Sequence, residues 1–360
     1  MPSVSQLQDI VTLTRNSELA YGSWTSLAND LPGYPLYDTL LPRTVLRSSS
    51  KIEWPIGVAA PSSAEYSHVN HPLAISVPDL AKKARVQLAK VRNAVSWSVD
   101  EEELQGNPGE EQVVSVVTMR KSEFDAEMKR FMEHQLVRKP VSSSTTPQEI
   151  YGLGYWFPRK SGATTLELNG GGNPTGFSTG AGEIAVADVP RWGHAVCGFN
   201  KLSDDDLFDK LSEFFLRAKY EAPSSANTLD PSTPSRIVLC QHQVFTAWER
   251  LQTTANDNLK SDLGMWRGAI NFRSVPVKVL HVISEDDSAD KPNDHGLLYA
   301  LDLNTLKLIV HSGFNFKLSE PTEDPNIPGQ IKMWRQAYVQ LLCTNREKNL
   351  VAETTNADLY

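Results

Sequence analysis

Hydrophobic and polar positions divide the chain into an irregular first segment, two strongly patterned segments and a strand-rich end. Residues 1–46 alternate short apolar groups with glycine and proline, as in Leu31-Pro32-Gly33-Tyr34-Pro35. Their apolar side chains have too little regular period to form a core by themselves. We therefore expect an arm that packs on something else.

The following segment has the pattern of a hairpin. Residues 44–58 are strand-like, and residues 61–78 are rich in serine, proline and histidine, which indicates a loop. Ala84, Val86 and Leu88 then alternate with Lys83, Arg85 and Gln87, as in a half-exposed strand. Together these stretches predict a long basic hairpin. A helix over residues 79–95 is the alternative, because Asp79 would cap it and alanine, lysine and leucine favour helices.

The clearest helix is predicted for residues 110–137. Glu110 and Glu111 lie in its first turn, where they favour the positive end of the helix dipole, and Arg138-Lys139-Pro140 supplies a basic end and a stop. Six apolar side chains share one broad face of this helix: Val113, Val117, Phe124, Met128, Phe131 and Met132.

The remainder mixes helices and strands unevenly. A glycine-rich loop over residues 152–182 precedes a helix that begins with Ser203 as its N-cap and continues through Phe215. A strand at 236–240 then leads into a helix near 243–251. Further strands are predicted at 270–272, 275–283, 297–303, 306–310 and 314–318. We see no internal repeat and no regular strand-helix alternation, so the fold class is α+β rather than a barrel or a doubly wound sheet.

Composition excludes several classes of protein. With 40% hydrophobic and 22% charged residues, the 360-residue chain is typical of a globular protein of about two domains. The net charge of -8 argues against nonspecific binding to phosphate backbones. Apolar runs are too short for a membrane span, and the first residues do not resemble a secretory signal. Cys197, Cys240 and Cys343 are odd in number and widely spaced, which indicates buried free thiols in a reducing compartment.

Two glycine-containing motifs match the sequence of a catalytic or cofactor-binding signature but lack its structural context. Gly176-Phe177-Ser178-Thr179-Gly180 matches the nucleophile elbow, but the flanking residues predict neither the strand before it nor the helix after it. Gly180-Ala181-Gly182 with Ala185 matches the loose dinucleotide fingerprint and lacks the same context. We therefore expect no enzyme activity and no cofactor, and a serine hydrolase using Ser178 stays as a minor alternative.

Histidines and acidic runs are further candidate metal ligands. His68 with His71, and His194 with Cys197, lack the second pair that a zinc site needs, so no metal is expected. Glu101-Glu102-Glu103 and Asp204-Asp205-Asp206 are contiguous, so neighbouring side chains point different ways, which favours a solvated loop and a helix start.

The ordered series of elements resembles the major capsid proteins of tailed bacteriophages with the Hong Kong 97-like fold. The arm, the hairpin and the long helix occur in the family's order, and Glu149-Ile150-Tyr151-Gly152-Leu153-Gly154 is similar to its short Gly-Leu segment. The closing strands are the most telling part. They contain Phe272-Arg273-Ser274-Val275-Pro276-Val277, Gly296-Leu297-Leu298-Tyr299-Ala300-Leu301-Asp302 and Leu341-Leu342-Cys343-Thr344-Asn345-Arg346.

The resemblance implies a division into five parts. These are an N-terminal arm (1–46), an extended hairpin loop (47–96), a peripheral domain with a spine helix (97–150), an axial domain (151–304) and a return to the peripheral domain (305–360). It also implies a structural protein that assembles into hexamers and pentamers of an icosahedral head around double-stranded DNA, in the host cytoplasm and without a membrane. Scaffolding, portal and decoration proteins are its implied partners. An encapsulin-like bacterial compartment shell is the main alternative.

A charge contact between subunits follows as a hypothesis. Lys82, Lys83 and Arg85 make one strand of the hairpin basic, and the run before the long helix is acidic. We predict that the Lys83 and Arg85 face pairs with Glu102 and Glu110 of an adjacent subunit.

Overall fold

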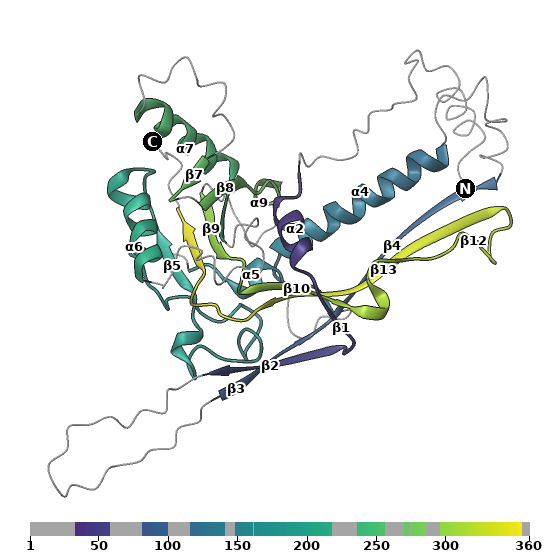
Figure 1. Cartoon of the computed structure of the whole chain (residues 1–360), viewed down its shortest axis with the longest axis horizontal. Helices are drawn as coiled ribbons and strands as arrows, with labels where there is room; N and C mark the ends of the chain where they lie inside the picture. Colours follow the sequence, from purple (N-terminus) through teal and green to yellow (C-terminus); the bar gives the residue numbers. More distant parts are fainter. Residues whose placement is uncertain are drawn as a thin grey trace, which may run out of the picture.

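The computed structural model describes residues 33–57, 81–99, 116–140, 148–160, 162–217, 236–255, 270–273, 275–285 and 296–354. In this part of the chain, two six-stranded sheets and a separate two-stranded hairpin carry the fold, with helices packed on the sheets (Figure 1). The predicted α+β class is confirmed.

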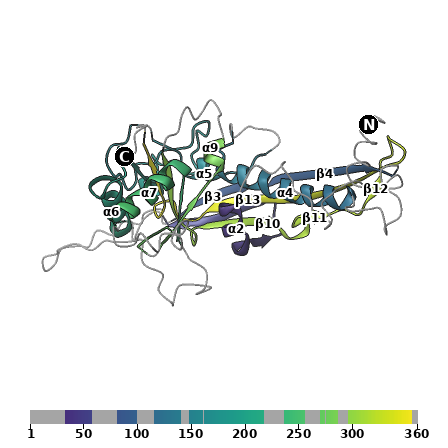
Figure 2. The same cartoon turned by 90° about the horizontal axis from the view of Figure 1, so that it is seen from above.

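The first sheet is built around one long strand, β13 (Gln330–Cys343). One edge of β13 pairs with β4 (Ala89–Ser98) through ten consecutive antiparallel residue pairs. We call this pairing the long ladder, and Figure 2 shows it extending away from the part of the molecule that holds the second sheet. The other edge pairs with three short strands, which are β10 (Leu306–His311), β11 (Lys317–Leu318) and β12 (Thr322–Glu323). Parallel to β10, β1 (Val45–Arg47) closes the sheet.

Two helices cover one face of this sheet. The longer, α4 (Val116–Val137), buries Phe124, Met128, Met132 and Leu136 at a spacing of four residues, which places them on one side of the helix. The shorter, α2 (Pro35–Leu40), packs beside it with Leu36 and Leu40 fully buried.

Most of the predicted long helix is confirmed, with one correction to its face. Residues 116–137 are helical, and residues 110–115 lie outside the described part of the chain. Phe131, which the sequence placed on the apolar face, is 40% exposed. It lies at the margin of the stripe formed by Phe124 and Met128.

The second sheet has the strand order β5-β14-β9-β6-β8-β7. Its strands are β5 (Ala195–Gly198), β6 (Arg236–Cys240), β7 (Ile270–Phe272), β8 (Val275–Val279), β9 (Leu297–Asp302) and β14 (Leu350–Glu353). All six residues of β9 are buried, as expected for a central strand covered on both faces. The last described strand, β14, therefore lies in this sheet, while β10 to β13 belong to the first.

Helices α6 (Asp209–Arg217) and α7 (His242–Ala255) pack on this sheet around an aromatic cluster. Phe208, Trp248 and Phe272 lie with ring centroids 4.9 to 5.8 Å apart. A π-helical turn, η3 (Asp204–Phe208), leads into α6. Ser203 is the N-cap residue of this turn, as predicted, although its side chain makes no capping hydrogen bond. The carboxylate of Asp206 instead accepts the N–H groups of Asn200 and Lys201, which holds the turn before the helix.

The hairpin is formed by β2 (Lys51–Gly57) and β3 (Ala81–Gln87) in antiparallel register. Ala84 and Val86 are buried while Lys83, Arg85 and Gln87 are exposed, so the period of two is confirmed and the alternative helix over 79–95 is wrong. The predicted loop at 61–78 lies outside the described residues.

Short elements account for the other differences from the sequence-based predictions. The strand predicted at 275–283 ends at Val279 and is followed by α9 (Val282–Glu285), and the one predicted at 314–318 is reduced to β11 after η5 (Ser312–Phe314). Helix α2 was not predicted, because its six residues are too few to show a helical period. The remaining short helices are η1 (Leu41–Arg43), α5 (Leu153–Trp156) and η2 (Pro190–Trp192).

Candidate subunit interface

The basic strand of the hairpin has carboxylate partners within its own chain. Arg85 lies 3.0 Å from a Glu53 oxygen and 3.6 Å from a Glu183 oxygen, and Lys82 lies 3.2 Å from Asp188. Lys83 has only a 4.0 Å contact with Glu53, and its side chain is 71% exposed. Of the three predicted interface cations, Lys83 is therefore the one most available to a second molecule.

Alternation along β3 separates these cations onto two faces. Lys83 and Arg85 share a face with Glu53, which is the register partner of Arg85 on β2. Lys82 points to the other side, where it reaches Asp188. The structure thus brings the three cations together on one strand, while Glu102 and Glu110 lie outside the described residues.

The base of the hairpin is seated on the glycine-rich loop. The backbone N–H of Arg85 donates to the carbonyl of Gly182 at 3.0 Å, and the N–H of Gly182 donates to the Tyr155 hydroxyl at 2.8 Å. Gly182 has a φ of +63° and lies against Ala84 and the Trp156 ring, so a side chain there would be strained. The seat fixes where the hairpin leaves the body of the protein.

Arg346, which sequence reasoning did not single out, is fully buried where the chain passes from β13 to β14. Its Nε donates to the carbonyl of Trp156 at 2.7 Å, and its Nη2 donates to the carbonyl of Gly172 at 3.1 Å. Burial lowers the pKa of Arg346 to about 10. The guanidinium joins segments more than 150 residues apart in sequence. From the sequence, Arg346 was marked only as the last residue of the closing segment.

His194 belongs to the same hydrogen-bonded cluster as Arg346. Its Nδ1 lies 3.1 Å from Nη2 of Arg346 and its Nε2 lies 2.8 Å from the carbonyl of Pro158. Because the guanidinium only donates, Nδ1 is the acceptor and Nε2 carries the proton. Burial, and then the Arg346 charge, hold the pKa of His194 well below its usual range. Both ring nitrogens are occupied, so His194 is a structural residue rather than a metal ligand.

A buried carboxylate joins the arm to α4. Both carboxylate oxygens of Glu133 accept backbone N–H groups at the start of α2, from Leu36 at 3.0 Å and from Tyr37 at 2.7 Å. Burial raises the pKa of Glu133 to about 7, against the two hydrogen bonds, which lower it. No local pattern indicates this contact, because it joins residues almost 100 positions apart.

The described residues give no catalytic context to Ser178. It is exposed within a series of turns from Gly176 to Gly180, with no strand before it and no helix after it. Cys197, Cys240 and Cys343 are buried free thiols, as expected, and burial raises the pKa of each to about 12. Across the described ranges, no three histidine, cysteine or acidic side chains lie close enough together to hold a metal ion. In the same ranges no helix is long and apolar enough to span a membrane.

The arrangement of these parts defines a class of fold. A hairpin seated on a glycine-rich loop, a long helix on a long ladder, and a second compact sheet make up the Hong Kong 97-like capsid fold, as predicted from the sequence.

Solved structures carry this conclusion. The chain is similar to the protein in the cyanophage A-1(L) capsid asymmetric unit, with a TM-score of 0.64, 15% identity and coverage of 96% of this chain and 99% of that one. It is also similar to the capsid of Myoviridae phage XM1 (TM-score 0.55, 10% identity, 95% and 98% covered) and to that of the native GTA particle (0.53, 10%, 92% and 95%). No protein-family model matches the sequence, and no curated protein matches it.

Proposed function

We propose that this chain is the major capsid protein of a tailed bacteriophage, which assembles into hexamers and pentamers of an icosahedral head around double-stranded DNA. The observation that carries the proposal is the fold, which matches a phage capsid protein over 96% of this chain and 99% of the other.

The physical basis of assembly is a set of modest contacts that repeat around closed rings. Interfaces in stable complexes bury about 800 Å² on each partner, so several contacts per subunit suffice to close a shell. The hairpin and the ladder are long, narrow pairs of strands that could make contacts of this kind (Figure 1). We place shell assembly in the host cytoplasm and the finished protein in the virion, with scaffolding, portal and decoration proteins as the partners of this proposal.

One subunit contact is proposed at the hairpin. Lys83 pairs with Glu102 or Glu110 of an adjacent subunit, with Arg85 and Lys82 mainly holding the hairpin on its own chain through Glu53, Glu183 and Asp188. The weak 4.0 Å contact of Lys83 supports this division of roles.

The proposal is tested with the purified full-length chain. Negative-stain electron microscopy of assembled material should show closed, icosahedral particles of uniform size. Particles purified from infected or expressing cells separate a phage head from an encapsulin-like compartment, because the first holds DNA and the second holds protein cargo. A chain that stays monomeric at all salt and protein concentrations would count against both.

A further inference from the structure

The long ladder has two faces, and α4 covers only one of them. Asn93 donates to the carbonyl of Phe124, and the ammonium group of Lys121 lies 5.6 Å from the Trp97 ring, so odd-numbered residues of β4 point toward α4. The even-numbered residues of β4 point the other way, and Lys90, Arg92, Ala94 and Ser96 are all exposed there. We call this exposed side the outer ladder face.

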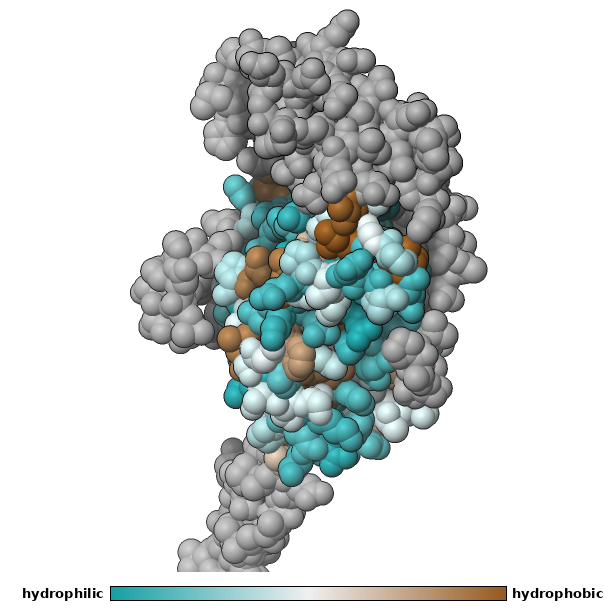
Figure 3. Space-filling model, turned by 90° about the vertical axis from the view of Figure 1, so that its right-hand side faces the viewer, coloured by the Kyte–Doolittle hydropathy of each residue, from teal (hydrophilic) through white to brown (hydrophobic). Residues whose placement is uncertain are grey.

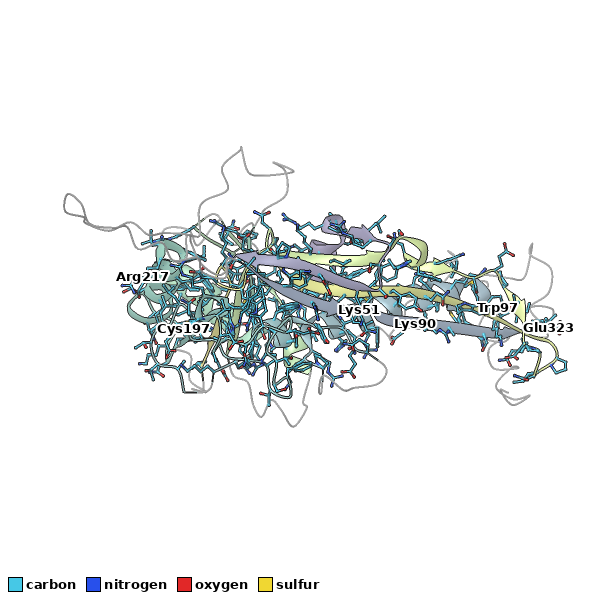
Figure 4. The ribbon with its side chains drawn as sticks, turned by 90° about the horizontal axis from the view of Figure 1, so that it is seen from below. Lys51, Lys90, Trp97, Cys197, Arg217 and Glu323 are labelled. Carbon is cyan, nitrogen blue, oxygen red and sulfur yellow. The ribbon has the colours of Figure 1, made fainter. Side chains whose placement is uncertain are left out.

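Cations gather on the outer ladder face. Arg92, Gln336 and Lys317 are register partners on β4, β13 and β11, so their side chains lie next to one another across three strands. Lys90 is the register partner of Tyr338, and its ammonium group lies 5.5 Å from that ring. Figure 4 shows Lys90 on the ladder, well away from Cys197 in the second sheet.

These cations lack carboxylate partners in the described part of the chain. Lys90, Arg92 and Lys317 form no ion pair there, whereas Lys332, farther along the same face, is paired with Asp324 at 3.1 Å. The exposed β4 residues of this face include no large apolar side chain, and Figure 3, which shows the right-hand side of the molecule in Figure 1, has hydrophobic residues only in separate small patches. Charge, rather than a large apolar patch, therefore determines what this face attracts.

We propose that the outer ladder face binds the acidic segment 101–111 of a second copy of this chain. That segment contains five glutamates and no basic residue. In an extended segment, Glu101 and Glu103 would be about 7 Å apart on one side, which matches the spacing of Lys90 and Arg92 on β4. Glu102 would point to the other side, so its proposed contact with Lys83 is not displaced.

The hairpin of a second copy fits this face less well. Its two described strands carry four basic residues and one acidic residue, so it would be repelled by Lys90 and Arg92. Duplex DNA is the other polyanion in the proposed assembly. Fluorescence anisotropy with a short DNA duplex distinguishes it from the acidic segment. The inference rests on the proposed function, because its occupant is another subunit of the same assembly.

Charge exchange between two full-length variants tests the pairing. Variant A carries Lys90→Glu and Arg92→Glu, and variant B carries Glu101→Lys and Glu103→Lys. Each alone should raise the protein concentration needed for association by about tenfold in low salt, and by much less in 1 M salt, where screening acts over about 3 Å. Association is followed by analytical ultracentrifugation, so the readout does not require closed shells.

Mixing the two variants separates contacts between subunits from contacts within one. In a mixture, the acidic face of variant A meets the basic segment of variant B, and the unchanged face of variant B meets the unchanged segment of variant A. Equal amounts of the two should therefore associate nearly as well as the wild-type chain. If mixing gives no recovery but one chain carrying all four substitutions recovers, the pair lies within a subunit and the proposal is wrong.

A control with the same change in charge is Lys129→Glu with Lys201→Glu. Both lysines are exposed, and they lie on α4 and between β5 and η3. If association weakens as much in this control as in variant A, the effect comes from the change in net charge and the proposal is overturned. Fluorescence anisotropy with a short DNA duplex is the second control. If variant A loses DNA binding but associates normally, the face binds nucleic acid instead. Wild-type shells with unaffected variants would refute only this inference, whereas a wild-type chain without shells would refute the proposed function.

Discussion

Replacing Glu133 should release the arm from α4. Glu133→Ala leaves the N–H groups of Leu36 and Tyr37 buried without an acceptor, at about 1–3 kcal/mol each. Relief from burying a carboxylate offsets part of this loss, so we expect a net cost of about 2–5 kcal/mol. Glu133→Gln keeps one acceptor oxygen and should cost about 1–3 kcal/mol, since its amide nitrogen cannot accept the second N–H.

The stability lost on replacing Glu133 should appear as local opening of α2. Water can satisfy the two N–H groups once residues 33–43 detach, so the arm should open before the sheets unfold. Hydrogen exchange followed by mass spectrometry on the unassembled full-length chain measures this opening directly. Amides at 36–40 should exchange faster by about the factor that the cost implies, tenfold for each 1.4 kcal/mol, while amides of β13 stay protected. Unchanged protection at 36–40 in Glu133→Ala would show that the buried carboxylate does not hold the arm.

Further predictions concern titration, the buried cluster, the hairpin and Ser178. Because the pKa of Glu133 is raised from 4.5 to about 7, the folded chain keeps a proton that the unfolded chain releases in that window, and the free energy of unfolding should fall by about 3 kcal/mol as pH rises through it. Glu133→Gln should lack this slope when its urea unfolding is compared with wild type, and identical slopes would contradict the assignment. Arg346→Met should cost about 3–5 kcal/mol by the same measurement, since the buried carbonyl of Trp156 and the part-buried carbonyl of Gly172 lose their donor; a cost below about 1 kcal/mol would argue against the cluster. Lys83→Glu should weaken association in low salt with little effect on thermal stability, whereas Arg85→Glu should lower both, and equal effects would remove the proposed division of roles. A fluorophosphonate probe should not label Ser178, and labelling that Ser178→Ala abolishes would revive the hydrolase alternative.

Local patterns predicted the elements that are long or strictly periodic. The alternation around Lys83 and Arg85 marked β3, and the four-residue spacing of Phe124, Met128 and Met132 marked α4, because both periods arise from backbone geometry. Strand β6 was predicted with its observed bounds, as its run of apolar residues is central to a sheet.

What escaped prediction depends on contacts between distant residues. Glu133 looks like a solvated residue on a helix until α2 is folded against it, and Arg346 looks like a surface cation until three chain segments surround it. Short elements such as α2 and α9 have too few residues for a period, so tertiary packing decides their conformation. The hairpin cations were recognised as basic, but their partners Glu183 and Asp188 come from a loop whose path no local pattern specifies.

The most direct measurement is electron cryomicroscopy of particles assembled from the full-length chain. The account predicts a closed shell in which each subunit keeps the fold described above, with its outer ladder face covered by an acidic segment and its hairpin lying on a neighbouring subunit. Open aggregates, or a lone monomer whose ladder and hairpin contact no other copy at any concentration, would contradict it.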